Sequence, residues 1–265
     1  MLAGRTAVVT GGGGGIGRAI SERFAAEGAT VIVAEIDAAR ASETVAAIIA
    51  AGGAASAVVV DVTDPDAVAG LARDAGGVDV LVNNVGHYLT AGNDFLANGP
   101  DAWDELYAVN LRHVLLCTRA FVDGMIERGR GSVVNISSVE GFRAIPSRPV
   151  YAAFKAAVGG FTKSLAVDLG NSGVRVNAIA PDLVESLQVP YARWVGAEDA
   201  ERIPSWVPVG RFGTGDDIAG VALFLASDLS GFVTGTTVHA DGGSLAAGGW
   251  FRRPDGTWTN RPVIS

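Results

Sequence analysis

The sequence predicts an α/β fold, with one doubly wound sheet of about seven parallel strands and helices on both faces. Three observations predict it. Short β-branched runs alternate with longer helix-like segments along most of the chain. A glycine-rich stretch follows the first run and leads into a helix-like segment. No repeat, charge run or Pro/Ser linker divides the chain, so we expect residues 1–265 to form a single domain.

The strand-like runs are short and rich in valine and isoleucine, as expected for strands that are buried on both faces. They span residues 6–10, 30–35, 56–61, 78–83, 131–137, 174–180 and 235–241. The helix-like segments between them span residues 16–27, 38–51, 64–75, 101–128, 150–170 and 215–227. Residues 183–213 and 242–265 do not follow this alternation. We expect the first of them to be a substrate-binding insertion and the second to be a C-terminal tail at a subunit interface.

Composition excludes several classes of function. The formal net charge of −8 and the pI near 4.9 argue against nucleic acid as a partner, because phosphate binding depends mainly on lysine and arginine. A single cysteine, Cys117, rules out an intramolecular disulfide framework and fits a reducing compartment. No segment is typical of a signal peptide or a membrane span. We therefore expect a cytoplasmic protein with no membrane partner.

The stretch from Thr10 to Ile20 contains five consecutive glycines between a strand and a helix. In a Rossmann-like fold such a turn receives a pyrophosphate, because glycines allow close backbone approach and the helix N-terminus offers free N–H donors. Two spacings fit at once, Gly12-x-Gly14-x-x-Gly17 and Gly11-x-x-x-Gly15-x-Gly17. A flexible turn without a ligand is the alternative.

Glu35 ends the second strand-like run, where a carboxylate can accept hydrogen bonds from the adenosine ribose. Its charge would repel a 2'-phosphate, and no arginine or lysine is adjacent in the sequence to compensate. We therefore expect NAD as the cofactor in preference to NADP. Asp37 could share this role, or it could cap the helix that follows.

Tyr151 and Lys155 are four residues apart in an alanine-rich helical segment, so their side chains project from one face. A phenol with a pKa of about 10 is a poor base near pH 7, and lowering that pKa by roughly three units takes about 4 kcal/mol. An ammonium at about 4 Å supplies roughly that amount at an effective dielectric of about 20. Ser138, at the end of an earlier strand, could hydrogen-bond the substrate oxygen, although strand-end turns often carry serine.

These motifs together resemble the short-chain dehydrogenase/reductase family over nearly the whole chain. Besides the glycines and the Tyr-x-x-x-Lys pair, the resemblance rests on "DV" at 61–62, "NNVG" at 83–86, "YAVNL" around Asn110, and "RVNAIAP" at 175–181. It implies hydride transfer between a nicotinamide and a secondary alcohol or ketone. It also implies a catalytic set in which Tyr151 is the acid/base, Ser138 positions the substrate oxygen, Lys155 holds the nicotinamide ribose, and Asn110 supports a proton-relay water.

The resemblance further implies a set of cofactor contacts. These are Gly11, Gly14, Gly15, Ile16, Gly17, Glu35, Ile36, Asp61, Val62, Asn84, Val85, Gly86, Tyr151, Lys155, Pro181, Val184 and Ser186. Two positions depart from the family pattern. Phe154 stands where a serine often precedes the lysine, which puts the packing behind Lys155 in doubt. Asp182 stands where a glycine often follows the proline, which puts the loop over the nicotinamide in doubt.

Candidate substrate contacts follow the strand ends and occupy the insertion, where loops form the crevice of such folds. They are His87, Ser138, Glu140, Tyr151, Tyr191 and Trp194. This set predicts a hydrophobic or cyclic secondary alcohol or ketone as the small-molecule substrate. Glu140 could bind a second hydroxyl of a diol, or it could be a solvated loop carboxylate. For each aromatic, core packing is the alternative.

The motifs leave other functions open. A 3-oxoacyl thioester reductase, a cis-dihydrodiol dehydrogenase and a catalytically idle NAD-binding regulator would each share these motifs. The three histidines show no metal-ligand spacing, so no metal site is expected. The tail carries Trp250, Phe251 and Trp258, which we do not expect to be left in water. Since family members commonly form tetramers, a homotetramer is expected.

Overall fold

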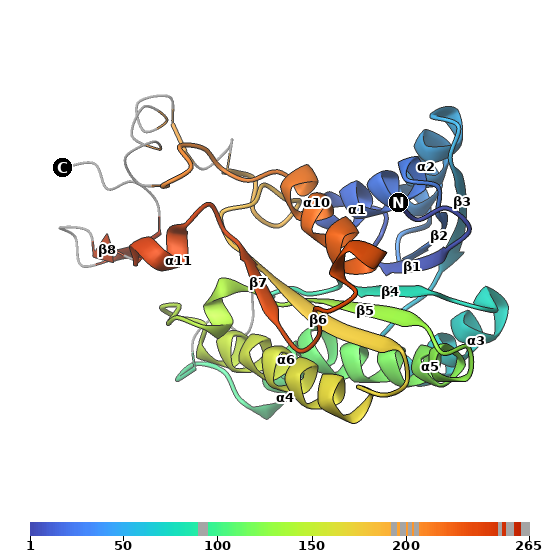
Figure 1. Cartoon of the computed structure of the whole chain (residues 1–265). Coiled ribbons are helices and arrows are strands. Elements are labelled where there is room, and N and C mark those ends of the chain that lie inside the picture. The colour runs from blue at the N-terminus through green and yellow to red at the C-terminus, as the bar shows by residue number, and fades with distance from the viewer. Residues whose placement is uncertain are drawn as a thin grey trace.

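The computed structural model of the chain describes residues 1–89, 95–191, 195–196, 200, 203, 207–248, 251–252 and 257–260. Within these residues one parallel sheet has the strand order β3-β2-β1-β4-β5-β6-β7. Its strands are β1 (Thr6–Thr10), β2 (Thr30–Glu35), β3 (Ala54–Val59), β4 (Val80–Asn83), β5 (Gly131–Ile136), β6 (Val174–Pro181) and β7 (Thr237–Ala240). Figure 1 shows this sheet between two layers of helices. The predicted α/β class and the seven parallel strands are confirmed.

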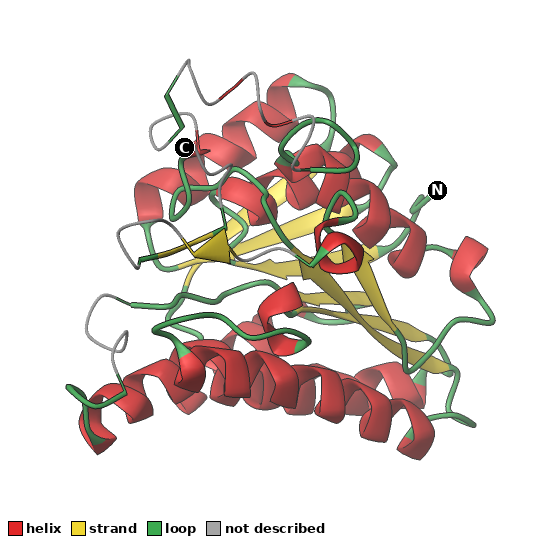
Figure 2. Cartoon of the chain, turned by 90° about the vertical axis from the view of Figure 1, so that its left-hand side faces the viewer, coloured by secondary structure: helices red, strands yellow, loops and turns green. Residues whose placement is uncertain are grey.

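Helices α1 (Gly15–Ala26), α2 (Ala38–Ala50) and α10 (Gly215–Ala226) cover one face of the sheet. Helices α3 (Pro65–Ala75), α4 (Pro100–Tyr107), α5 (His113–Glu127) and α6 (Pro149–Asp168) lie on the other, as Figures 1 and 2 both show. Neighbouring residues of a strand serve opposite layers. Val9 packs with Val33 in the core under α1, whereas Val8 packs with Ile32 in the core over α5. Both faces of the central strands are therefore buried, which explains why these strands are so uniformly apolar, whereas the edge strand β3 is largely exposed.

The helical segment predicted at residues 101–128 is interrupted in the structure. It consists of α4, then a π-helical turn at Ala108–Arg112, and then α5. Such turns insert one residue into the α-helical hydrogen-bond pattern and occur frequently at functional sites. Asn110 lies in this turn and is fully buried. A sequence pattern with a period near 3.6 does not reveal this interruption.

Smaller elements complete the described part of the chain. They are a 3-10 turn at Val139–Gly141, a second at Asp228–Ser230, α11 (Ser244–Ala247), and the antiparallel pair β8 (Phe251–Arg252) and β9 (Trp258–Thr259). A small hydrophobic cluster, separate from the two main cores, lies in the insertion. It contains Leu183, Tyr191 and Val207, with Phe212 packed against it. No helix among the described residues has the length and apolarity needed to cross a bilayer.

Candidate active site

A cleft lies at the carboxyl ends of the strands, where the segments that follow β1, β4, β5 and β6 come together. The strand order reverses between β1 and β4, and α/β sheets bind ligands at such a switch point. The cleft has a volume of about 1110 Å³. The predicted site residues that line it are Gly11, Gly14, Gly15, Ile16, Glu35, Ile36, Asn84, Val85, Gly86, His87, Ser138, Glu140, Tyr151, Lys155, Pro181, Val184, Ser186 and Tyr191.

The glycine-rich loop forms one wall of the cleft and leads into α1. Gly11 has a φ of 61° and Gly15 a φ of 51°, which are left-handed conformations that side chains other than glycine disfavour. The N-cap of α1, Gly14, makes no side-chain capping bond, and the first turn holds no acidic residue. No acidic side chain of the first turn therefore neutralises this positive helix end at the cleft, and this arrangement fits a pyrophosphate.

Glu35 is buried at the end of β2, beside the glycine-rich loop. Its carboxylate accepts hydrogen bonds from the backbone N–H groups of Gly13, Ile36 and Asp37. It also pairs with Arg40, whose Nη2 lies 3.0 Å from Glu35 Oε1. The expectation that no basic residue compensates Glu35 is therefore wrong, because the first turn of α2 brings Arg40 back to the carboxylate. Asp37 is the N-cap of α2, and its side chain accepts hydrogen bonds from the N–H groups of Ala39 and Arg40. Of its two predicted roles, the structure thus shows the helix cap.

Two asparagines hold the loop that follows β4. Asn84 donates from Nδ2 to the carbonyls of Thr10 (3.0 Å) and Gly11 (3.3 Å), which fixes the start of the glycine-rich loop. Asn110 donates to the carbonyls of His87 (2.7 Å) and Leu106 (2.9 Å) and accepts from the His87 N–H. The Asn110 side chain does not line the cleft and is committed to positioning His87. The predicted support of a relay water by Asn110 stays a prediction.

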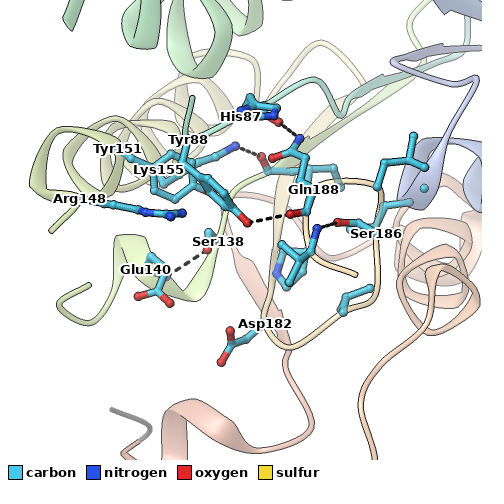
Figure 3. Close-up of a pocket in the computed structure, with 18 of the residues that line it drawn as sticks. His87, Tyr88, Ser138, Glu140, Arg148, Tyr151, Lys155, Asp182, Ser186 and Gln188 are labelled. Atoms are coloured by element: carbon cyan, nitrogen blue, oxygen red, sulfur yellow. Dashed lines mark hydrogen bonds between the residues drawn. The ribbon is translucent and has the colours of Figure 1, made fainter. Parts of the chain in front are cut away.

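Ser138, Tyr151 and Lys155 converge on the cleft (Figure 3). Ser138 lies close enough to the Tyr151 phenol to act on its pKa, and Lys155 Nζ lies 5.7 Å from the centroid of the Tyr151 ring. Helix α6 carries both Tyr151 and Lys155, and it is held against the end of β5 by two bonds. Ser137 donates to the Lys155 carbonyl at 2.8 Å, and Lys155 Nζ donates to the Ile136 carbonyl at 3.1 Å.

Burial changes the proton affinity of this group in the protein without a ligand. It raises the pKa of Tyr151, against the lowering effect of Ser138. Burial also lowers the pKa of Lys155 to about 8. Together with the Lys155 charge, burial lowers the pKa of the neighbouring His113 to about 3, so this imidazole is neutral. The expected low pKa of Tyr151 is therefore not reached by the protein alone, because desolvation outweighs the lowering effects of Ser138 and Arg148.

The substrate side of the cleft is more polar than the sequence indicated. Glu140 is buried, which contradicts its reading as a solvated carboxylate, and its Oε1 lies 3.1 Å from Arg143 Nη2. The same nitrogen lies 2.7 Å from Asp182 Oδ2, which also accepts a 2.5 Å hydrogen bond from Ser244. Burial raises the pKa of Asp182, although its charged partners oppose this effect. The unusual aspartate at 182 thus ties the loop after β6 to the turn after β5 and to α11.

Some predicted residues do not line the cleft. Gly17 serves packing, because a Cβ there would lie 2.1 Å from the Gly11 carbonyl oxygen. Asp61 accepts hydrogen bonds from the N–H and hydroxyl of Thr63, and Val62 is buried in the core over α5, so their adenine contacts stay predictions. Trp194 lies outside the described residues. Tyr191 reaches the cleft but is mainly a core residue, stacked on Phe212 at 4.3 Å.

Sequence reasoning missed several residues that line the cleft. They are Arg40, Arg148, Leu187, Gln188, Thr257, Thr259 and Asn260. Arg148 carried a usable signal, since it stands one helical turn before Tyr151. Gln188 and the tail residues carried none, because only the tertiary fold returns them to the cleft. The tail was expected at a subunit interface, and its described residues 257, 259 and 260 line the cleft of their own chain.

Known proteins match this chain over most of its length. A family model described as enoyl-(acyl carrier protein) reductase matches residues 11–244. The galactitol 2-dehydrogenase of Agrobacterium fabrum is 38% identical over 253 residues, which cover 91% of this chain and 97% of that protein.

Solved structures share both the fold and the sequence. A protein of Agrobacterium tumefaciens with bound NADP is 40% identical, with a TM-score of 0.84 over 92% of this chain and 98% of the other. A 3-oxoacyl-[acyl-carrier protein] reductase of Brucella melitensis with bound NAD is 36% identical, with a TM-score of 0.82 over 91% of each chain. The cleft and these likenesses agree: the chain belongs to the short-chain dehydrogenase/reductase family, whose members act on CH–OH or keto substrates.

Proposed function

We propose that this protein is an NAD(H)-dependent oxidoreductase that interconverts a secondary alcohol and a ketone, with Tyr151 as the acid/base. One observation carries the proposal. Ser138 and the Lys155 ammonium lie beside Tyr151 in a cleft that also reaches the uncapped N-terminus of α1. A proton-transferring group and a dinucleotide cradle thus share one cavity.

The residues divide the chemical work. Ser138 donates a hydrogen bond to the substrate oxygen, which orients the carbinol carbon. Tyr151 takes the hydroxyl proton during oxidation and returns it during ketone reduction. Lys155 supplies positive charge beside the phenol, which favours phenolate. A bound nicotinamide would supply the hydride acceptor, so that the carbinol carbon loses a hydride while its hydroxyl proton passes to Tyr151.

The glycine-rich loop, Glu35, the loop of residues 84–86, Lys155 and Ser186 would hold the cofactor. A left-handed cradle and a helix end without an acidic side chain in its first turn are the chemistry that a pyrophosphate requires. The Glu35 carboxylate supports NAD, because it would repel a 2'-phosphate. Arg40 would reduce that repulsion, and relatives bind either cofactor, so the preference for NAD is a proposal that the Discussion tests.

A hydrophobic or cyclic substrate remains our proposal for the organic partner. Ile145, Leu183, Val189 and Tyr191 give the cleft an apolar part, and the insertion of residues 183–213 contributes three of them. The alternative, reduction of 3-oxoacyl thioesters, is favoured by the activity of the Brucella melitensis relative. Glu140 is engaged by Arg143, which weakens the diol role on which a cis-dihydrodiol dehydrogenase would depend.

We also propose that the protein is a cytoplasmic homotetramer. The buried free thiol of Cys117 fits a reducing compartment, and Val167, Leu229 and Phe232 are largely exposed apolar side chains that assembly would cover. A mass measurement in solution tests the assembly. A monomer at micromolar concentration would contradict it.

Nicotinamide fluorescence with a panel of cyclic alcohols, dihydrodiols and 3-hydroxyacyl thioesters tests the function. We expect NADH to form with at least one secondary alcohol and not to form with the Tyr151→Phe variant. Cofactor binding without turnover of any substrate, in either direction and with either NAD or NADP, would instead support the idle NAD-binding regulator.

A further inference from the structure

Arg148 lies at the substrate end of the cleft. It is the N-cap residue of α6 and stands one turn before Tyr151. Its Cζ lies 3.9 Å from the centroid of the Tyr88 ring, and the Tyr88 ring meets the Tyr151 ring edge to face at 5.6 Å. Figure 3 shows Arg148 and Tyr151 in the same part of the cleft. The guanidinium is therefore close to the atoms at which the proposed reaction takes place.

Within the described part of the chain no carboxylate forms an ion pair with Arg148, whose guanidinium lies over the Tyr88 ring. Arg143, only five residues earlier, behaves differently because it is paired with both Glu140 and Asp182. The charge of Arg148 is still felt by its neighbours. It contributes to lowering the pKa of His87 and opposes the rise in the pKa of Tyr151, whereas Glu140 acts on Tyr151 in the opposite sense.

The neighbouring imidazole adds a second donor. His87 Nδ1 accepts a 2.7 Å hydrogen bond from the Leu89 N–H, so the neutral ring carries its proton on Nε2. Burial, followed by the charge of Arg148, lowers the pKa of His87 and keeps the ring neutral. This end of the cleft thus combines an unneutralised cation with an N–H donor, which is an environment for an anion.

The position of Arg148 separates this anion from the adenosine part of a dinucleotide. Glu35 and Arg40 mark the adenosine end, after β2, whereas the segment carrying Arg148 follows β5. Three strand spacings separate β2 from β5 in the sheet, which is roughly 14 Å. A 2'-phosphate at the adenosine end is therefore not the anion that Arg148 would meet.

We propose that Arg148 binds a carboxylate of the substrate, so that the enzyme acts on a hydroxy acid and the corresponding oxo acid. The planar guanidinium matches a carboxylate in two parallel hydrogen bonds, and its place beside Tyr88 fixes the distance between the carboxylate and the reacting carbon. The inference rests on the proposed function. It names a free acid as the substrate class, in preference to a neutral alcohol or a thioester.

Two matched pairs of probes test this inference. They are 3-hydroxybutyrate and its methyl ester, and 4-hydroxycyclohexanecarboxylate and its methyl ester, each assayed with NAD and with NADP. We expect the wild-type enzyme to prefer the acid of at least one pair. Arg148→Met should lower kcat/KM for that acid about 10- to 100-fold while changing kcat/KM for its ester less than about threefold. Arg148→Lys should restore part of the preference, because it keeps the charge without the planar fork.

Arg73→Met serves as the matched control, since Arg73 is exposed on α3 and lies outside the cleft. Arg73→Met should leave kcat/KM for the acid and kcat/KM for the ester unchanged. Equal turnover of acid and ester, unaffected by Arg148→Met, would overturn the inference and leave the proposed function standing. A clear preference for 3-hydroxyacyl thioesters over the free acids would also overturn it.

A binding measurement separates the two proposals. Calorimetry with cyclohexanecarboxylate, which has no hydroxyl to oxidise, is carried out on the complex with NADH. Binding that Arg148→Met weakens about tenfold, and that falls as salt is added, supports the carboxylate site even if no probe is turned over. Binding that is equal in the wild-type and Arg148→Met proteins contradicts the site.

Discussion

Gly86 lies directly against Lys155, because a Cβ on Gly86 would stand 2.7 Å from Lys155 Nζ. Only a side-chain end blocks that Cβ, so the chain can fold around an alanine by displacing the ammonium. We predict that Gly86→Ala lowers kcat at least tenfold while changing the melting temperature by less than about 3 °C. Steady-state kinetics and calorimetry on one preparation check both parts.

Gly17→Ala provides the contrast. A Cβ at Gly17 would meet the Gly11 carbonyl oxygen at 2.1 Å, and backbone cannot move aside as a lysine side chain can. This variant should be strongly destabilised or fail to fold. Retention of normal stability in Gly17→Ala, or normal activity in Gly86→Ala, would show that the close packing described for the loop is wrong.

The proton role of Tyr151 predicts opposite pH dependences for the two directions. Oxidation needs phenolate, so its kcat/KM should rise with pH, and the rise should continue into the alkaline range because burial raises the pKa of Tyr151. Reduction needs the phenol and should fall only at the alkaline end. Tyr151→Phe should lower kcat about 10²- to 10⁴-fold in both directions. A flat oxidation profile would contradict the assignment.

We predict that the buried Lys155 ammonium lowers the free energy of unfolding at pH 7. Its pKa falls from 10.5 to about 8 on burial, so the folded state disfavours the charged form below pH 8. Lys155→Met should therefore raise the free energy of unfolding at pH 7 by about 1–3 kcal/mol while abolishing turnover. For the wild-type protein, stability should rise between about pH 8 and pH 10.5, as the unfolded state binds the extra proton.

Lys163→Met is the matched control, since Lys163 is exposed on the same helix. It should change stability by less than about 0.5 kcal/mol. Denaturant unfolding at pH 7 and pH 10 measures both variants. A loss of stability in Lys155→Met would mean that the bond from Lys155 to the Ile136 carbonyl outweighs the desolvation of the ammonium.

The Glu35–Arg40 pair should set the choice between NAD and NADP. Arg40 is half-exposed at the edge of the cleft, so its guanidinium can turn from Glu35 toward a 2'-phosphate. Arg40→Met should raise KM for NADP about tenfold and leave KM for NAD within about threefold. Glu35→Ser should lower KM for NADP. Identical cofactor ratios in wild type and both variants would remove this pair from cofactor selection.

Arg143 should matter for stability because it neutralises two buried carboxylates. Arg143→Met removes the positive charge that Arg143 places beside Glu140 and Asp182, which should cost about 3–5 kcal/mol at pH 8. The pKa of Asp182, which burial already raises, should then rise further above its unfolded value, so the loss should grow as pH rises above about 4. Denaturant unfolding at pH 5.5 and pH 8 measures the difference.

Arg211→Met is the control for this experiment. Arg211 also makes two short bonds to a carboxylate, Asp217, but 55% of its side chain is exposed. Because exposed ion pairs contribute little, this variant should lose less than about 1 kcal/mol. An equal loss in the two variants would show that burial does not distinguish the two arginines.

The sequence predicted the elements that follow strict periodicity. Each strand of the sheet lies within two residues of its predicted start, because apolar runs between polar turns mark strands that are buried on both faces. The interruption around Asn110 was missed, since a π turn leaves the spacing of apolar residues almost unchanged. The order of the strands was not predicted, because no particular residue specifies which strands are neighbours.

The candidate site also contains residues that the sequence could place and residues that it could not. Residues that end strands or begin helices, such as Ser138 and Gly15, could be placed from their neighbours in the chain. The pairing of Glu35 with Arg40 could not, because it depends on how the first turn of α2 folds back. The network of Arg143 with Asp182 joins segments about forty residues apart and needs the three-dimensional fold.

The described tail residues 257, 259 and 260 line the same cleft as Gly11. The ribosome synthesises the chain from the N-terminus at roughly 5–20 residues per second. The glycine-rich loop therefore leaves the ribosome long before residues 257–260 do. A nascent chain can pair β1 with β4 while one wall of its cleft is still inside the ribosome. Capture of a dinucleotide and its substrate by the finished cavity must therefore wait until residues 257–260 have left the exit tunnel.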